Sequence, residues 1–157
     1  MNNKLKVLKT IAKRFNETGV HYAVGASVLL YFKGIVDEFH DLDIMIDNDD
    51  ADKVREILNE LGQLQYTPEN KNFKTKTFLQ YVVDGVDIDI IGGFIIVKDS
   101  IEYDCYLQKD IDDFVEIDDI KINLDTIDNW HKYYSLMNRT NKVEMIESYY
   151  KKDISTK

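Results

Sequence analysis

The chain has 157 residues, the length of one ordinary domain, and we expect residues 1–157 to form a single domain with a substantial core. Apolar residues make up 44% and charged residues 31%, a balance typical of globular proteins rather than disordered ones. The formal net charge of −9 opposes non-specific contact with a phosphate backbone, so general nucleic-acid binding is not expected. A single bound nucleotide stays compatible with this charge, because divalent cations bridge carboxylates to phosphates.

The cysteine content and the hydropathy pattern indicate the compartment. Cys105 is the only cysteine, which excludes an internal disulfide and fits a reducing environment. No apolar run approaches the roughly 18 residues that span a bilayer. The N-terminal sequence MNNKLKVLKT lacks the apolar centre of a signal peptide. We therefore expect a cytoplasmic protein that does not enter a membrane.

The first half of the chain alternates predicted helices with short buried strands. Apolar side chains recur at helical spacing before Gly19, which is a plausible helix stop. The turn Gly25-Ala26-Ser27 then separates a strand from a helix that opens at Ser27, and Asp49 or Asp50 is the expected cap of a later helix. The expected elements are a helix at 2–18, a strand at 21–24, a helix at 28–32, a strand at 42–46 and a helix that ends at 61.

The second half is predicted to be antiparallel strands followed by helices. Asp84-Gly85 is a strong hairpin signal, and Asp118-Asp119 is the expected turn of a later hairpin. The expected strands are 73–83, 86–91, 94–97, 103–107 and a pair within 113–123, and the expected helices are 125–138 and 140–151. This order predicts an α/β (α+β) domain, a mixed sheet flanked by helices, with further helices at the C-terminus.

Two Asp-x-Asp pairs are the main chemical signal. Residues two apart in a strand point to the same face, so Asp41 and Asp43 project together, as do Asp87 and Asp89. Carboxylates about 7 Å apart on an apolar strand repel unless a cation lies between them. One such pair alone is more often a solvated strand end. Two pairs with a small-residue turn upstream favour a magnesium site that holds phosphates.

The turn before the first pair is the third part of the signal. Gly25 lets the backbone approach a ligand closely, and the amides near Ala26 and Ser27 can face phosphate oxygens. Taken alone, Ser27 is more often a plain helix N-cap. No Gly-Lys-Ser/Thr follows, so the turn is not a P-loop.

These residues resemble the nucleotidyltransferase superfamily that shares the DNA polymerase β palm. Its signature is a pair of small residues, then Asp-x-Asp, then a third acid on a later strand. Here Ala26-Ser27 precedes Asp41-Leu42-Asp43 by thirteen residues, and Asp89 begins the run Asp-Ile-Ile-Gly-Gly. The turn is Gly-Ala-Ser rather than Gly-Gly or Gly-Ser, and Glu38-Phe39-His40 replaces the arginine and Ser/Thr common in relatives.

The C-terminal third resembles the small aminoglycoside- and lincosamide-type nucleotidyltransferases, which often end in a short strand pair and a helix with basic residues. That resemblance implies Arg139 and Lys142 as nucleotide contacts, beside Gly25, Ala26 and Ser27. It further implies that Asp41, Asp43 and Asp89 are catalytic and hold two Mg²⁺ ions against a nucleoside triphosphate. Asp89 is the implied acceptor of the proton from the attacking hydroxyl. The roles of Asp87 and His40 are left open.

Three functional readings follow. The leading one is transfer of an NMP, AMP in the first instance, to a hydroxyl of a small-molecule acceptor such as an aminoglycoside or lincosamide. A second keeps the chemistry but makes the acceptor a protein partner, as in an antitoxin or toxin that nucleotidylates it. A third is a catalytically silent nucleotide-binding module, which the intact acids oppose.

A homodimer is left open. His21, His40 and His131 form no metal-ligand spacing, and Cys105 reads as a buried structural thiol.

Overall fold

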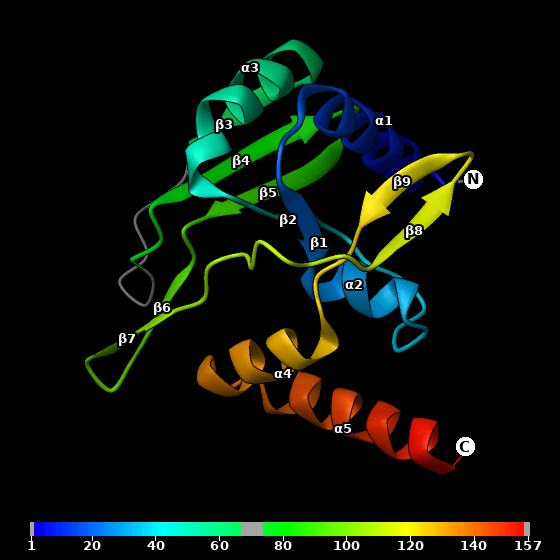
Figure 1. Ribbon diagram of the computed structural model, residues 1–157, viewed down its shortest axis with the longest axis vertical. Helices are drawn as coiled ribbons and strands as arrows, with labels where there is room; N and C mark the ends of the chain where they lie inside the picture. Colours follow the sequence, from blue (N-terminus) through cyan, green and yellow to red (C-terminus); the bar gives the residue numbers. More distant parts are fainter. Residues whose placement is uncertain (1, 67–73, 156–157) are drawn as a thin grey trace.

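A mixed five-stranded sheet is the centre of the molecule, whose computed structural model describes residues 2–66 and 74–155. The strand order is β1-β2-β5-β4-β3, in which β2 and β5 are parallel and all other neighbours are antiparallel. These strands are β1 (Tyr22–Gly25), β2 (Leu42–Ile46), β3 (Gln63–Gln65), β4 (Thr77–Val83) and β5 (Val86–Gly92). This architecture, seen in Figure 1, is the mixed sheet that the sequence predicts.

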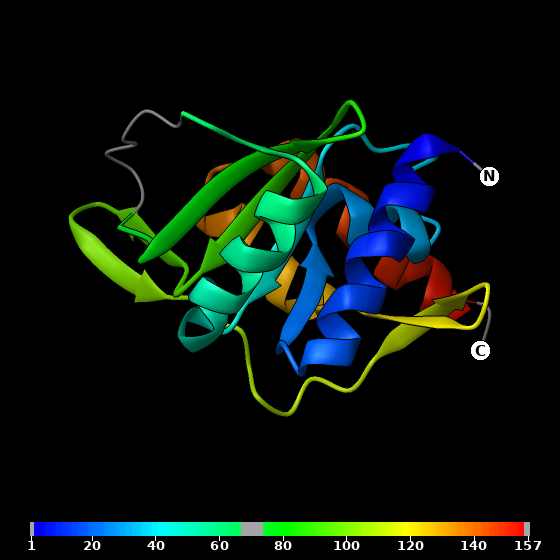
Figure 2. The same ribbon diagram turned by 90° about the horizontal axis from the view of Figure 1, so that it is seen from above.

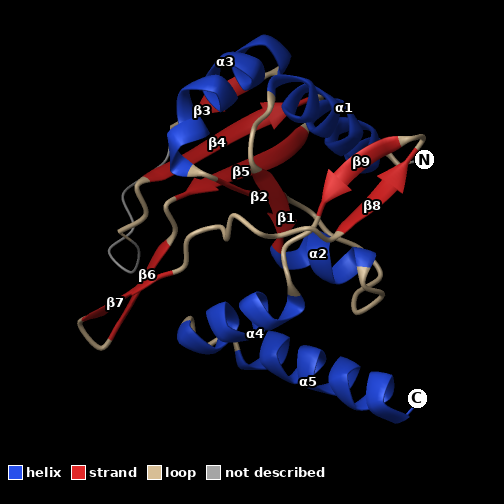
Figure 3. Ribbon diagram, viewed as in Figure 1, coloured by secondary structure: helices blue, strands red, loops and turns tan. Residues whose placement is uncertain are grey.

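Helices cover the sheet unequally. Helices α1 (Asn3–Thr18) and α3 (Ala51–Leu61) pack side by side on one face, as Figure 2 shows from above. Helix α2 (Ala26–Phe32) follows β1 directly. Helices α4 (Ile127–Leu136) and α5 (Thr140–Ser155) pack against each other and lie away from α1 and α3 (Figure 1). Figure 3 shows two further hairpins beside the sheet: β6 (Ile95–Lys98) with β7 (Ile101–Asp104), and β8 (Phe114–Ile117) with β9 (Ile120–Asn123).

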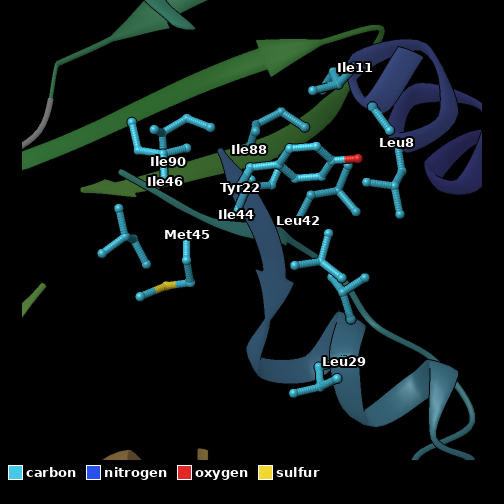
Figure 4. Packing of buried hydrophobic residues seen from close by; sticks show 14 of the residues in the cluster. Leu8, Ile11, Tyr22, Leu29, Leu42, Ile44, Met45, Ile46, Ile88 and Ile90 are labelled. Carbon is cyan, nitrogen blue, oxygen red and sulfur yellow. The ribbon is translucent and has the colours of Figure 1, made fainter. Parts of the chain in front are cut away.

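The alternation of side chains along the central strands separates a core face from an open face. Leu42, Ile44, Ile88 and Ile90 are fully buried and meet α1 residues such as Leu8 in one cluster (Figure 4). The residues between them point the other way, as the two-residue period of a strand requires. Because Leu42, Ile44, Ile88 and Ile90 are buried on one face, the aspartates between them on β2 and β5 lie together on the opposite face.

Local signals in the sequence place most of the turns correctly. Gly19 ends α1 in the left-handed conformation, with φ of 73°. Asp84 and Gly85 both have positive φ, as the two-residue hairpin between β4 and β5 needs. Asp118 and Asp119 do the same between β8 and β9. These three predictions are confirmed.

Several expected boundaries are wrong by a few residues. Helix α2 starts at Ala26, so Gly25 occupies the N-cap position and Ser27 is not the cap. The Asp47 side chain caps a short 3₁₀ turn, Asn48–Asp50, and α3 follows it without a cap from Asp49 or Asp50.

The strands show smaller differences. The strand expected at 103–107 is β7, because the positive φ of Asp99 and Ser100 closes the hairpin earlier than predicted. The strand expected from 73 begins at Thr77, residue 73 itself lying outside the described residues, and the edge strand β3 was not expected. Among the described residues no helix is both long enough and apolar enough to cross a bilayer.

Gly62 provides a test of the packing between α3 and the sheet. A β-carbon on residue 62 would lie 2.2 Å from the carbonyl oxygen of Val82, a backbone atom of β4 that has no freedom to move aside. We expect Gly62→Ala to cost about 2 kcal/mol of stability and to lower the Tm by about 4–8 °C in thermal denaturation. Gly34→Asn is the control, because nothing lies within 4 Å of that site and asparagine tolerates its positive φ. Equal melting temperatures for the Gly62 variant and wild type would contradict this packing.

Candidate functional site

One row of residues crosses four strands on the open face of the sheet. Gly25 of β1 pairs with Asp43 of β2, Asp43 pairs with Asp89 of β5, and Asp89 pairs with Gln80 of β4. Residues in register on neighbouring strands project to the same side, so the two carboxyls and the glutamine amide stand next to one another. The parallel pairing of β2 and β5 is thus what joins acids 46 residues apart in the chain.

Asp43 and Asp89, neighbours in the register of β2 and β5, each influence the pKa of the other. Burial raises the pKa of Asp43 well above its usual range, and the negative charge of Asp89 raises it further. Burial also raises the pKa of Asp89, while the Gln80 Nε2 group, which donates to its Oδ1 at 3.1 Å, opposes that rise. Two half-buried carboxyls this close do not both ionise unless a positive charge joins them.

Asp41 lies just before β2 and is exposed, yet its charge contributes to the raised pKa of both Asp43 and Asp89. The three acids therefore interact electrostatically. Within residues 2–66 and 74–155, however, no three His, Cys, Asp or Glu side chains are gathered closely enough to hold a metal ion as they stand. The donor set is nevertheless of the right chemistry, because carboxylate oxygens are the ligands that magnesium prefers.

The turn from β1 into α2 lies beside Asp43. Gly25 is extended, with φ of −130°, and its α-carbon faces the ring of Trp130. Ala26 adopts φ of 52°, a left-handed conformation that costs a residue with a side chain about 1–2 kcal/mol. The amides of Ala26 and Ser27 are among the first of the helix and lack a helical acceptor. The predicted phosphate-binding turn is therefore a strained turn next to the acid pair.

Helix α4 brings an aromatic group toward the same acids, and basic residues follow it in the chain. Burial and the charge of Asp43 both raise the pKa of the Tyr134 phenol above its ordinary value, and Arg139 lowers it. The Arg139 guanidinium lies 5.9 Å from the centre of the Tyr134 ring. Tyr134 thus interacts with both Arg139 and Asp43. Lys142 follows on α5, where its amide donates to the Arg139 carbonyl, and its side chain forms no ion pair within the described part of the chain.

Other sequence candidates are not brought into this row. Asp87 is exposed on the same face as Asp89, two residues away, and its charge adds to the raised pKa of Asp89. The His40 side chain is 80% exposed and lies 4.0 Å from Glu38. Cys105 is buried, and burial raises the pKa of its thiol to about 11, which suits a structural cysteine. A hollow of about 510 Å³ lies elsewhere, between α1 and the β8–β9 turn, and Lys9, Lys13 and Asp118 contribute to its lining.

Sequence reasoning missed three residues that adjoin the row. Gln80 was within reach, because counting outward from the Asp84-Gly85 turn places it opposite Asp89. Trp130 and Asp125 had no comparable signal. They approach Gly25 only because the loop entering α4 returns to β1, where the Asp125 amide donates to the Val24 carbonyl at 3.0 Å.

Three solved structures resemble this chain over nearly its whole length. A Thermotoga maritima protein assigned as a nucleotidyltransferase superposes with a TM-score of 0.74 and 22% identity, covering 97% of this chain and 96% of that one. The chain has the nucleotidyltransferase fold. The lincosamide antibiotic adenylyltransferase LnuA bound to lincomycin shares this nucleotidyltransferase fold at a TM-score of 0.62 and 16% identity, over 91% and 96% of the two chains. ANT(2'')-Ia in complex with adenylyl-2''-tobramycin does so at 0.61 and 8%, over 92% and 88%. The sequence matches no protein-family model and has no significant match among curated proteins.

The raised pKa values predict how stability depends on pH. A carboxyl with a raised pKa stabilises the folded state below its unfolded pKa of about 4, and that contribution is lost as the pH rises through the folded value. Asp43→Asn removes the charge that must otherwise be desolvated. We expect its Tm in metal-free buffer to match wild type near pH 4 and to exceed it by about 2–5 °C at pH 7.5, measured by calorimetry.

The control for this measurement is Asp99→Asn, which removes a charge from an exposed turn far from the row in the fold. It should follow the wild-type curve at both pH values. An Asp43→Asn variant that is less stable than wild type at pH 7.5 would show that the carboxyl pair is not strained.

Proposed function

We propose that this protein is a nucleotidyltransferase that moves an NMP, AMP from ATP in the first instance, to a hydroxyl of a small acceptor and releases pyrophosphate. The observation that carries the proposal is the row Gly25–Asp43–Asp89, in which two carboxyls are in register on neighbouring strands beside a strained turn. The nucleotidyltransferase fold supports it. Raised pKa values from burial and like charge are typical of functional acids.

Asp41, Asp43 and Asp89 are the residues that would hold magnesium. Two Mg²⁺ ions at such a site supply charge neutralisation and orientation for in-line transfer at the α-phosphate. Asp41 projects to the same side of the chain as Asp43, so rotation of its exposed side chain brings a third carboxylate to the pair. With the pair ionised, Asp89 is free to accept the proton of the attacking hydroxyl, and Gln80 holds its Oδ1 in place.

The nucleotide is expected on the side of the row that carries the turn. The amides of Ala26 and Ser27, together with the Ser27 hydroxyl, are placed to bind the β- and γ-phosphates. Arg139, whose guanidinium lies over the ring of Tyr134, is the candidate for neutralising phosphate charge, and Lys142 on α5 is a weaker one. The strain at Ala26 is of the kind that accompanies binding sites.

The acceptor is expected on the other side of the row, over β4 and β5. Phe78 is 41% exposed there. With Gln80 and Val82 it lies on the face of the sheet that carries Asp87 and Asp89. An apolar ring on the face that carries the Asp87 and Asp89 carboxyls suits a hydroxylated, cationic small molecule. LnuA is solved with lincomycin and ANT(2'')-Ia with adenylyl-2''-tobramycin, which supports aminoglycosides and lincosamides as the acceptors to test first.

Calorimetric titration of ATP, GTP, CTP and UTP with Mg²⁺ tests the nucleotide part of this proposal. Wild type should bind at least one triphosphate only when Mg²⁺ is present, and Asp41→Asn/Asp43→Asn should abolish that binding. Pyrophosphate release with aminoglycoside and lincosamide acceptors should fall by roughly 1,000-fold in the variant, since metal ligation is worth several kcal/mol in the transition state.

Asp99→Asn is again the matched control, and it should bind and turn over as wild type does. Failure of wild type to bind any triphosphate would sink the enzyme hypothesis. Binding without turnover of any small acceptor would instead favour a protein acceptor or a silent nucleotide-binding module.

A further inference from the structure

A buried carboxylate that takes no part in the proposed chemistry lies next to the nucleotide turn. Asp125 is only 1% exposed, and every oxygen of its side chain has a partner. Oδ1 accepts from the Thr126 amide at 2.7 Å and from Asn129 Nδ2 at 2.9 Å, while Oδ2 accepts from Trp130 Nε1 at 3.1 Å. Its backbone amide donates to Val24, the residue before Gly25. Asp125 therefore joins the start of α4 to the end of β1, where the two segments meet in Figure 1.

Trp130, which Asp125 holds by a hydrogen bond, packs against the Gly25–Ala26 turn. A β-carbon on residue 25 would lie 2.5 Å from Trp130 Cζ2 and 2.7 Å from Nε1, so the indole edge rests directly on the Gly25 backbone. On its other sides the ring contacts three aromatic neighbours, Phe94, Tyr133 and Tyr134, at 6.4, 5.2 and 5.4 Å between ring centres. The indole is thus fixed by a buried hydrogen bond and by packing, and Gly25 is the residue it constrains.

The residue after Gly25 needs such a constraint. Ala26 holds φ of 52°, which an alanine leaves readily when nothing opposes the change. Helix α2 itself supplies no side-chain cap at this turn. The three atoms nearest to a β-carbon on Gly25 all belong to Trp130, so the indole is the group that opposes relaxation of the turn.

We propose that Asp125 and Trp130 are positioning residues that hold the Gly25–Ala26 turn in its strained, nucleotide-receiving conformation. This inference rests on the proposed function and deepens it. Trp130 acts through the backbone of Gly25 and touches no reacting atom, so it sets the affinity for the triphosphate rather than the rate of transfer. Where Trp130 or its hydrogen bond is lost, Ala26 relaxes to negative φ, and only a minor fraction of the molecules keeps the turn that binds the triphosphate. The apparent affinity for the triphosphate falls in proportion to that fraction.

Two variants and a rescue test the proposal. Trp130→Phe removes the indole Nε1 and part of the contact with Gly25. Asp125→Asn keeps the acceptor for Thr126 and Asn129 but presents an amide donor to the indole donor. Each should raise the Kd for the Mg²⁺–triphosphate complex, and the KM with it, by roughly tenfold while kcat stays within about threefold of wild type. Adding Ala26→Gly to Trp130→Phe should restore the affinity, because glycine adopts positive φ without strain.

Tyr133→Leu is the matched control. Tyr133 packs on Trp130 from the same helix, but a β-carbon on Gly25 would not meet it among its nearest atoms. Its loss should lower the Tm as the Trp130 change does, yet leave the Kd for the triphosphate near the wild-type value. A loss of affinity in all three variants that merely follows the loss of Tm, with no rescue by Ala26→Gly, would overturn the positioning role.

Trp130 also provides a direct readout, because it is the only tryptophan of the chain. Its emission in wild type should change on addition of the Mg²⁺–triphosphate complex that calorimetry shows to bind. If wild type binds no triphosphate, the proposed function itself fails. If wild type binds one and Trp130→Phe binds it equally well, only the positioning role is overturned.

Discussion

The parallel pairing of β2 with β5 is the constraint on which the rest of this structure depends. It places Asp43 beside Asp89 on the face of the sheet opposite α1 and α3, and the proximity of the two carboxyls helps to raise the pKa of Asp43. A sheet that buried this face as well would have to neutralise both acids permanently. The fold instead covers the opposite face with α1 and α3, so the acids remain half-buried and open to a cation and its phosphates.

The neighbourhood of the acid pair stores unfavourable free energy in two forms. One is electrostatic, in the raised pKa values of Asp43 and Asp89; the other is conformational, in the positive φ of Ala26. The two lie next to each other, because Gly25, which precedes Ala26, pairs with Asp43. Stability elsewhere has to offset them, and the fully buried set around Leu8, Ile44 and Ile88 is what does so.

Local patterns were sufficient for most elements, and they failed where a contact distant in sequence decides the outcome. The hairpin turns at Asp84-Gly85 and Asp118-Asp119 were predictable, because positive φ at two successive residues depends on the turn itself. The start of α2 was not. Ser27 carries the side chain that usually caps a helix, but the helix begins two residues earlier than expected, where the indole of Trp130 lies against Gly25. Asp50 does occupy the N-cap position of α3, but its carboxyl accepts a hydrogen bond from the backbone amide of His21, the residue before β1, instead of capping the helix.

By itself the sequence determined the fold class, the strand faces that carry the aspartates, and the resemblance that ties them to nucleotidyltransferases. These depend on residue spacing, and a strand turns a two-residue spacing into a shared face whatever surrounds it. Only the tertiary structure decided that Asp43 meets Asp89 across a parallel pair, that Gln80 and Tyr134 adjoin them, and that Asp125 and Trp130 hold the turn at Gly25. Such contacts join residues tens of positions apart, and they exist only once the sheet order and the return of the chain into α4 are established.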